Sequence, residues 1–137
     1  RDRKAVLSTL RQATDSITAL HNNAHIVILG DFNDQPHARI IRQALSSYHN
    51  LTARNCNGSY KYQGRWEQID QIFVSPSLLN NHEGLRIENG STAILQLPYL
   101  LEPDEKYGLQ RPRRTFIGPK YNGGVSDHLP VITYLTR

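Results

Sequence analysis

The chain opens with apolar side chains spaced three or four positions apart, with polar and charged ones between them. The members of this stripe are Val6, Leu10, Ala13, Ile17 and Leu20. The spacing predicts an amphipathic helix that lies with one face on the rest of the protein. Residues 26–29 then form an unbroken aliphatic run that ends at Gly30. Such a run predicts a central strand buried on both faces of a layered sheet.

A second helix is expected after this strand. Pro36 suits a first helical turn, and apolar positions follow it at 40, 41, 44 and 45. Beyond that helix the sequence pattern changes from helical to strand-like. Residues 60–62 and 65–66 flank Gln63-Gly64 in the pattern of a β-hairpin, and residues 69–74 read as a strand that stops at Pro76.

The remaining part of the chain has weaker patterns. Residues 85–87, 93–97 and 131–135 are short strand candidates. Residues 98–124 contain four of the nine glycines and four of the seven prolines, and show little periodicity. Loops of this length are functional or disordered in compact domains. The aromatic residues in this one favour an ordered loop: Tyr99, Tyr107, Phe116 and Tyr121.

Length and composition restrict the possibilities. The chain has 137 residues, the size of one ordinary domain, and a formal net charge of +4, which decides little about polyanion binding. Cys56 is the single cysteine, so neither an intrachain disulfide nor a cysteine metal cluster is expected. No apolar run approaches a membrane span, and no signal peptide is recognisable. Because the chain does not begin with Met, we expect a piece of a longer protein and leave localisation open.

Three acidic residues lie at strand positions where chemistry can be built. Asp31 follows the apolar run, Asp70 belongs to a strand, and Asp127 precedes the last strand. Strand ends of a layered α/β fold converge on one rim, where sites are built. Asn33 lies two positions after Asp31, so the two side chains point the same way if the chain stays extended.

The segment Ser126-Asp127-His128 places a hard oxygen ligand beside an imidazole that can accept a proton near neutral pH. Adjacent side chains diverge, so the two need separate partners. Asp127 is a candidate metal ligand. Asp70 is the best candidate for a carboxylate that orients the His128 ring from behind.

Each of these motifs also has an ordinary structural interpretation. Gly-Asp after a strand is often only a turn, and Ser-Asp-His-Leu-Pro can be a capped turn before a strand. Asp70 is harder to dismiss, because a half-buried carboxylate costs stability unless it has a partner. The occurrence of all three motifs in one order favours the functional interpretation.

Three blocks carry a family resemblance: Gly30-Asp31-Phe32-Asn33, residues 62–75 (YQGRWEQIDQIFVS) and residues 124–131 (GVSDHLPV). In order and separation they resemble the last three blocks of the endonuclease/exonuclease/phosphatase superfamily, and they are closest to its uncharacterised bacterial members. The resemblance implies an α/β fold in which residues 1–137 form the C-terminal half of a deoxyribonuclease I-like two-sheet α/β sandwich. Its sheets would be mixed and mostly antiparallel, with flanking helices.

The resemblance also implies roles for individual residues. His128 would be the general base that activates water, Asp70 its orienting carboxylate, and Asp127 a ligand to Mg²⁺ or Mn²⁺. Asp31 and Asn33 would position the nucleophile and stabilise the transition state. The reaction would be hydrolysis of a phosphate ester.

Part of the family's site is missing from this sequence. Family members carry an asparagine and a metal-binding glutamate in their N-terminal half. The glutamates 67, 83, 88, 102 and 105 of this chain all follow the first block, so none matches that position. We therefore expect a longer parent protein whose N-terminal half completes the domain. A separate chain that carries the missing half, or self-association through an exposed sheet face, are the alternatives. The chain alone should be nearly inactive.

The substrate remains open at this stage. The segment 98–124 carries Arg111, Arg113, Arg114 and Lys120, which could grip phosphates of a nucleic acid or could simply be solvated. These cations favour an endonuclease or exonuclease that cleaves phosphodiesters. A phosphomonoesterase or phospholipase of the same fold is the alternative, as are a catalytically silent binding protein and a plain nucleic-acid-binding module.

Overall fold

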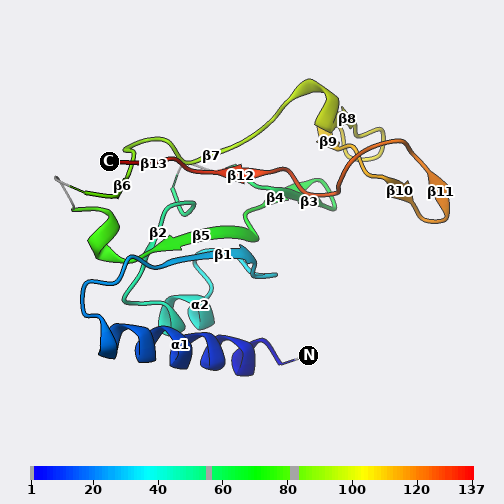
Figure 1. The fold of residues 1–137 in the computed structure, drawn as a ribbon. Coiled ribbons are helices and arrows are strands. Elements are labelled where there is room, and N and C mark those ends of the chain that lie inside the picture. Colours follow the sequence, from blue (N-terminus) through cyan, green and yellow to red (C-terminus); the bar gives the residue numbers. More distant parts are fainter. Residues whose placement is uncertain (1, 55–56, 81–83) are drawn as a thin grey trace.

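Strand β5 (Asp70–Val74) is the central strand of a three-stranded sheet in the order β1-β5-β2. Strand β1 (Val27–Asp31) pairs with all five residues of β5 in antiparallel register, and β2 (His49–Asn50) pairs with the C-terminal end of β5. This arrangement is seen in a computed structural model that describes residues 2–54, 57–80 and 84–137 (Figure 1). The sheet lies between a layer of helices and a layer of short strands.

Helices α1 (Arg3–Leu20) and α2 (Arg39–Ala44) cover one face of this sheet (Figure 1). A buried cluster joins the two layers: Leu7, Ile28, Ile41, Leu45 and Phe73. Both helices were predicted, but α2 begins at Arg39, so Pro36 lies in the turn that precedes it. Asp2 caps α1, since its carboxylate accepts a hydrogen bond from the Lys4 backbone N–H at 3.0 Å.

The buried stripe of α1 differs from the predicted one. Leu7 and Thr14 are buried, whereas Val6, Ile17 and Leu20 are exposed. The helix is therefore rotated so that Leu7 and Thr14 face inward together with Leu10, the member of the predicted stripe that packs on the core. Val6, Ile17 and Leu20 are left on the surface of the described chain.

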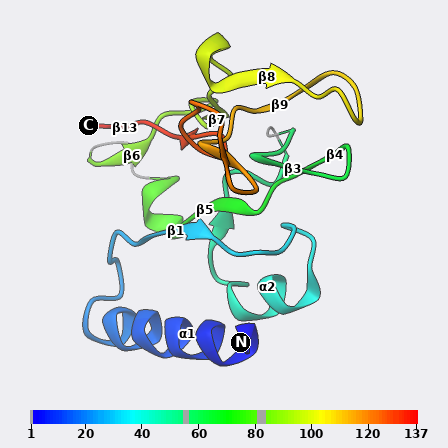
Figure 2. The same cartoon turned by 90° about the vertical axis from the view of Figure 1, so that its right-hand side faces the viewer.

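The opposite face of β5 packs against short strands (Figure 2). Ile72, Val74 and Leu78 form a second buried cluster, with Ile87 and Val131 packed on it from above. Leu78 belongs to a short 3₁₀-helix, η1 (Pro76–Leu78). The ladders of this layer pair β6 (Arg86–Ile87) with β13 (Leu135–Thr136), and β7 (Ala93–Ile94) with β12 (Val131–Ile132). The single strand expected over 131–135 is thus two short ones.

The prediction that the first strand is central and buried on both faces is wrong for the described chain. Strand β1 is at the edge of its sheet, and Leu29 is 70% exposed while Ile28 is buried against the helices. β5 occupies the central position that was assigned to β1.

The predicted hairpin is confirmed: β3 (Tyr60–Tyr62) pairs with β4 (Arg65–Glu67). Gln63 and Gly64 connect them with φ values of 46° and 82°. Two successive residues of positive φ give the turn whose twist matches that of the flanking strands. Gly64 supplies the second of these at no steric cost.

The segment 98–124 is ordered, as expected, but it is not simply a loop. It begins with a 3₁₀-helix, η2 (Pro98–Leu100), and continues as two hairpins. These pair β8 (Leu101–Pro103) with β9 (Gln110–Pro112), and β10 (Phe116–Ile117) with β11 (Lys120–Tyr121). Strands of two or three residues are too short to leave a periodic signal in the sequence.

The fold is a mixed α/β arrangement whose ladders, within the described residues, are all antiparallel. It is consistent with the predicted half of a deoxyribonuclease I-like fold. Cys56 and Glu83 lie outside the described residues. No helix of the described chain combines the length and apolar character needed to cross a membrane.

Candidate active site

Two carboxylates meet where β1 ends and β5 begins. Asp31 is the last residue of β1 and Asp70 the first of β5, and the antiparallel register pairs them directly. Directly paired residues of an antiparallel ladder project their side chains to the same face. The two predicted acidic positions are therefore brought together.

His128 completes this group. Its Nδ1 lies 2.6 Å from Asp70 Oδ2, and the two side chains are 25% and 23% exposed. The segment around His128 is held by the backbone: Leu129 N–H donates to the Ser59 carbonyl at 2.7 Å, and Tyr60 forms an isolated bridge with His128. The predicted partnership of Asp70 and His128 is thus present in the geometry.

Asp31, Asp70 and His128 could hold a metal ion, because one ligand atom from each lies within 4.8 Å of the others. Carboxylate oxygens are hard donors that suit Mg²⁺ or Mn²⁺, and such ions are typically held by one or two carboxylates together with waters. The donor chemistry therefore fits a divalent cation of this kind, with Asp31 the carboxylate least occupied by other side chains.

The chain does not stay extended from Asp31 to Asn33, so the condition under which both side chains were expected to point the same way is not met. Asn33 has φ 50°, and its backbone N–H donates to Asp31 Oδ1 at 2.7 Å. The Asp31 carboxylate thus stabilises the turn that ends β1, as asparagine and aspartate side chains often do. The Asn33 side chain is exposed beside this turn.

Asp127 is exposed and does not belong to the group formed by Asp31, Asp70 and His128. Its neighbour Ser126 accepts a hydrogen bond from the His128 backbone N–H at 3.0 Å, which makes a small turn of the segment. The role of Asp127 as a metal ligand stays a prediction that rests on the family resemblance.

The four basic residues expected to contact substrate have different surroundings. The guanidinium of Arg111 is paired with Glu102 at 2.9 Å. Arg114 lies over the ring of Tyr60 at 5.7 Å, and that ring lies 4.7 Å from the ring of His128. The side chains of Arg113 and Lys120 are exposed. Arg114 is therefore the one of the four that these ring contacts connect to the Asp70–His128 pair.

A buried ion pair anchors the hairpin β8–β9 to β3. Lys61 Nζ lies 2.9 Å from Asp104 Oδ2, with side chains 2% and 4% exposed, and donates to the Gly108 carbonyl at 2.7 Å. The hydrogen bond from Lys61 lowers the pKa of the Asp104 carboxyl below its ordinary value, and a bond from the Tyr107 backbone N–H adds to this effect. The pair holds the basic segment in place relative to the site.

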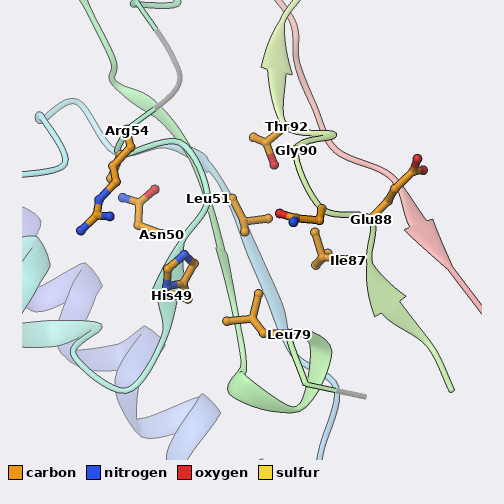
Figure 3. Close-up of a pocket in the computed structure, with 11 residues that line it drawn as sticks. His49, Asn50, Leu51, Arg54, Leu79, Ile87, Glu88, Gly90 and Thr92 are labelled. Atoms are coloured by element: carbon orange, nitrogen blue, oxygen red, sulfur yellow. The ribbon is translucent and has the colours of Figure 1, made fainter. Parts of the chain in front are cut away.

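A large hollow of the described chain lies away from the candidate site. It has a volume of about 830 Å³ and lies between His49, Asn50 and Arg54 on one side and Ile87 and Glu88 on the other (Figure 3). His49 pairs with Val74, at the opposite end of β5 from Asp70. The two ends of β5 are four residue steps apart, which is about 13 Å along a strand. None of the predicted site residues lines this hollow.

Two residues beside the site were not singled out from the sequence. Ser59 donates from Oγ to Asp70 Oδ2 at 2.5 Å, and the Tyr60 ring packs on His128. The sequence contains a faint signal for Ser59, since a glycine and a serine immediately precede the hairpin. It contains no signal that the serine faces Asp70, because that contact depends on how β3 lies beside β5.

The chain belongs to the endonuclease/exonuclease/phosphatase family, whose model matches residues 1–137. Membership supports a hydrolase of the phosphoesterase type, and the family is generally dependent on divalent metals. No curated protein matches the chain at a significant level.

Two solved structures have a similar fold. One is an endonuclease/exonuclease/phosphatase family protein from Bacteroides thetaiotaomicron, with 18% identity and a TM-score of 0.59 over 97% of this chain. The other is a functionally unknown conserved protein from Enterococcus faecalis V583, with 16% identity and a TM-score of 0.58 over 98% of this chain. In both cases the match spans 44% of the solved chain. At these identities the likeness shows the fold alone.

Proposed function

We propose that this chain carries the proton-transfer part of the active site of a phosphodiesterase, most simply an endonuclease or exonuclease. The observation that carries the proposal is the 2.6 Å contact between His128 Nδ1 and Asp70 Oδ2 beside a second carboxylate, Asp31. Family membership supplies the reaction class.

The geometry suits His128 for the role of general base. An ionised carboxylate can only accept hydrogen bonds, so contact with Asp70 requires the proton of a neutral imidazole to be on Nδ1. Nε2 then carries the lone pair that takes a proton from water. Asp70 holds this tautomer and stabilises the imidazolium that forms after the transfer, the role of the orienting group in acid–base pairs.

A Mg²⁺ or Mn²⁺ ion, when bound, would polarise phosphate oxygens and offset the charge that develops on the leaving group. Asp31 and Asp127 are the carboxylates that would hold it, the first supported by its place in the group of three and the second by the family resemblance. Asn33 is proposed to contact the phosphoryl group as a neutral donor.

A nucleic acid is the favoured substrate because of Arg114 and Tyr60. A guanidinium held over an aromatic ring keeps its fork of N–H donors available to a phosphate. Arg114, Tyr60 and His128 are adjacent in this structure. Arg113 and Lys120 would then contact the more distant phosphates of a chain.

The residues missing from the site are proposed to come from a segment outside this sequence. The two similar solved chains are more than twice as long as their match to this one. The open side of β1 and the exposed residue Leu29 give that segment a surface to cover. Self-association through the same surface is the alternative arrangement.

The test is hydrolysis of plasmid DNA, an abasic-site duplex and inositol polyphosphates in the presence of Mg²⁺ or Mn²⁺. This chain is compared with a protein extended upstream by the missing half. Cleavage of the DNA substrates by the longer protein alone supports the proposal. Selective hydrolysis of the inositol polyphosphates would instead assign a phosphomonoesterase, and absence of turnover in both would favour a silent binding protein.

A further inference from the structure

Ser59 has no exposed surface, and each of its polar groups is bonded to a segment of the site. Its backbone N–H donates to the Glu67 carbonyl at 2.9 Å, and its carbonyl accepts from Leu129 N–H at 2.7 Å. Its hydroxyl donates to Asp70 Oδ2 at 2.5 Å and accepts from the Asp70 backbone N–H at 3.3 Å. Ser59 therefore links the segment that carries Asp70 to the segment that carries His128.

The Ser59 hydroxyl and the His128 ring converge on a single oxygen atom. Asp70 Oδ2 receives Oγ of Ser59 at 2.5 Å and Nδ1 of His128 at 2.6 Å. The Asp70 backbone N–H donates to the same hydroxyl. Ser59 therefore holds both the backbone and the carboxylate of Asp70. Hydrogen bonds to the rear of a carboxylate fix the rotamer of that carboxylate. A fixed carboxylate in turn selects the tautomer of the histidine ring bonded to it.

Gly58 shows that the position of Ser59 depends on a specific local backbone. A Cβ at Gly58 would lie 2.7 Å from Trp66 Cβ and 2.8 Å from the Glu67 backbone nitrogen, and its φ is +120°. A side chain there is excluded both by space and by conformation. The glycine lets the chain approach β4 closely enough for Ser59 to reach Asp70.

We propose that Ser59 is a positioning residue, which holds the Asp70 carboxylate so that His128 keeps its proton on Nδ1 and its lone pair on Nε2. The inference deepens the proposed function and rests on it for its catalytic meaning. The proposal also makes a claim about the tautomer of the His128 ring. That tautomer can be measured without any substrate.

The decisive experiment is nitrogen-15 NMR of the His128 imidazole in this chain at mildly alkaline pH. In the native chain we expect the Nδ1-protonated tautomer and a slowly exchanging Nδ1 proton. Ser59→Ala should broaden or remove that proton signal and mix the tautomers, and Ser59→Thr, which keeps the hydroxyl, should restore the native spectrum. A native His128 spectrum in a folded Ser59→Ala protein would overturn the proposal.

A matched control is available at the other end of β5. Ser75 is also buried, and its hydroxyl bonds to the backbone of Ile26 and Ala24, far from His128. Ser75→Ala should leave the His128 spectrum unchanged. If Ser59→Ala fails to fold, Ser59→Cys retains the volume with only a weak donor. The Cys variant should then show the mixed tautomers, and a native spectrum would again contradict the inference.

Activity gives a second, separable readout in the longer protein. Ser59→Ala should lower kcat about 10- to 100-fold, the usual effect of losing a group behind a site residue, with KM little changed. An inactive native enzyme would defeat the proposed function and leave the NMR result standing. An active enzyme with unchanged kcat in Ser59→Ala would defeat the inference alone.

Discussion

Asp31 and Asp70 are paired in the register of β1 and β5, so the two strands deliver their carboxylates to one face of the sheet. The pairing explains how residues 39 positions apart (70 minus 31) join one site. It also makes the site dependent on strand register, because a slip by one residue would turn one of the two side chains to the opposite face.

Removal of the His128 imidazole should abolish most turnover. In the protein extended upstream, His128→Ala is expected to lower kcat by a factor on the order of 10² or more while KM changes little, because a general base acts in the transition state. His21→Ala, an exposed histidine at the end of α1, is the control. Near-normal turnover in His128→Ala would reject the assignment.

The chain alone should bind Mg²⁺ weakly, with a dissociation constant on the order of millimolar or above, because an octahedral ion held by few carboxylates needs each of them. Titration calorimetry measures this directly. Asp31→Asn should remove the residual binding, and Asp15→Asn, on the exposed surface of α1, should not change it. Tight binding by this chain would contradict the argument that a ligand is missing.

The central part of the fold could be predicted from the sequence because its signals are local. Gln63-Gly64 between two strand-like segments predicts the β3–β4 turn, and the apolar run before Pro76 predicts β5. The edge position of β1 could not be predicted, since it depends on which segments are present beside it. The hairpins of residues 98–124 were missed because their strands have no measurable period.

The residues of the candidate site could also be predicted from local motifs, whereas their contacts with residues far away in the sequence could not. The motifs identified Asp31, Asp70 and His128, and the structure brings these three together. A turn after Gly30-Asp31 was considered, but the positive φ of Asn33 was not predicted, because it leaves no unambiguous mark in a sequence. The pairing of Arg111 with Glu102 was missed as well, since it arises only when β8 and β9 form a hairpin.

Removal of one partner of the buried Lys61–Asp104 pair should lower the free energy of unfolding more than removal of one partner of a surface ion pair. Lys61→Met leaves a buried carboxylate without its partner, so it should destabilise the chain more than the double substitution Lys61→Met with Asp104→Leu. Arg11→Met, which removes the exposed pair with Asp15, should cost about 0–1 kcal/mol. Urea unfolding of the four proteins checks this order, and equal losses in the single and double variants would refute it.

The same pair predicts a pH dependence. The pKa of Asp104 is lower in the folded chain than in the unfolded one, so its contribution to stability is present above the unfolded value and is lost as pH falls through the folded value. The native chain should therefore lose more stability between about pH 5 and pH 2 than the double variant does. Parallel losses in the two proteins would show that Asp104 contributes nothing to acid lability.

Leu29 tests whether the open side of β1 is covered in a longer protein. In this chain Leu29→Ala should change the free energy of unfolding by less than about 0.5 kcal/mol, because the side chain is largely exposed. In the protein extended upstream it should cost about 2 kcal/mol or more. Ile28→Ala, which is buried against the helices here, should be costly in both proteins. An equally small effect of Leu29→Ala in both would indicate that this surface stays free.

Asp70 and His128, which contact each other, belong to parts of the fold that differ in local stability. Asp70 begins a strand that pairs over five residues and is covered on both faces, whereas His128 precedes β12 and β13, whose ladders comprise two residues each. Segments with short ladders open at lower free energy than the whole molecule. On gradual heating the imidazole would therefore separate from its carboxylate while the sheet and helices persist. Any activity that depends on this contact would be lost through local opening of the segment around His128, below the temperature at which the sheet and helices unfold.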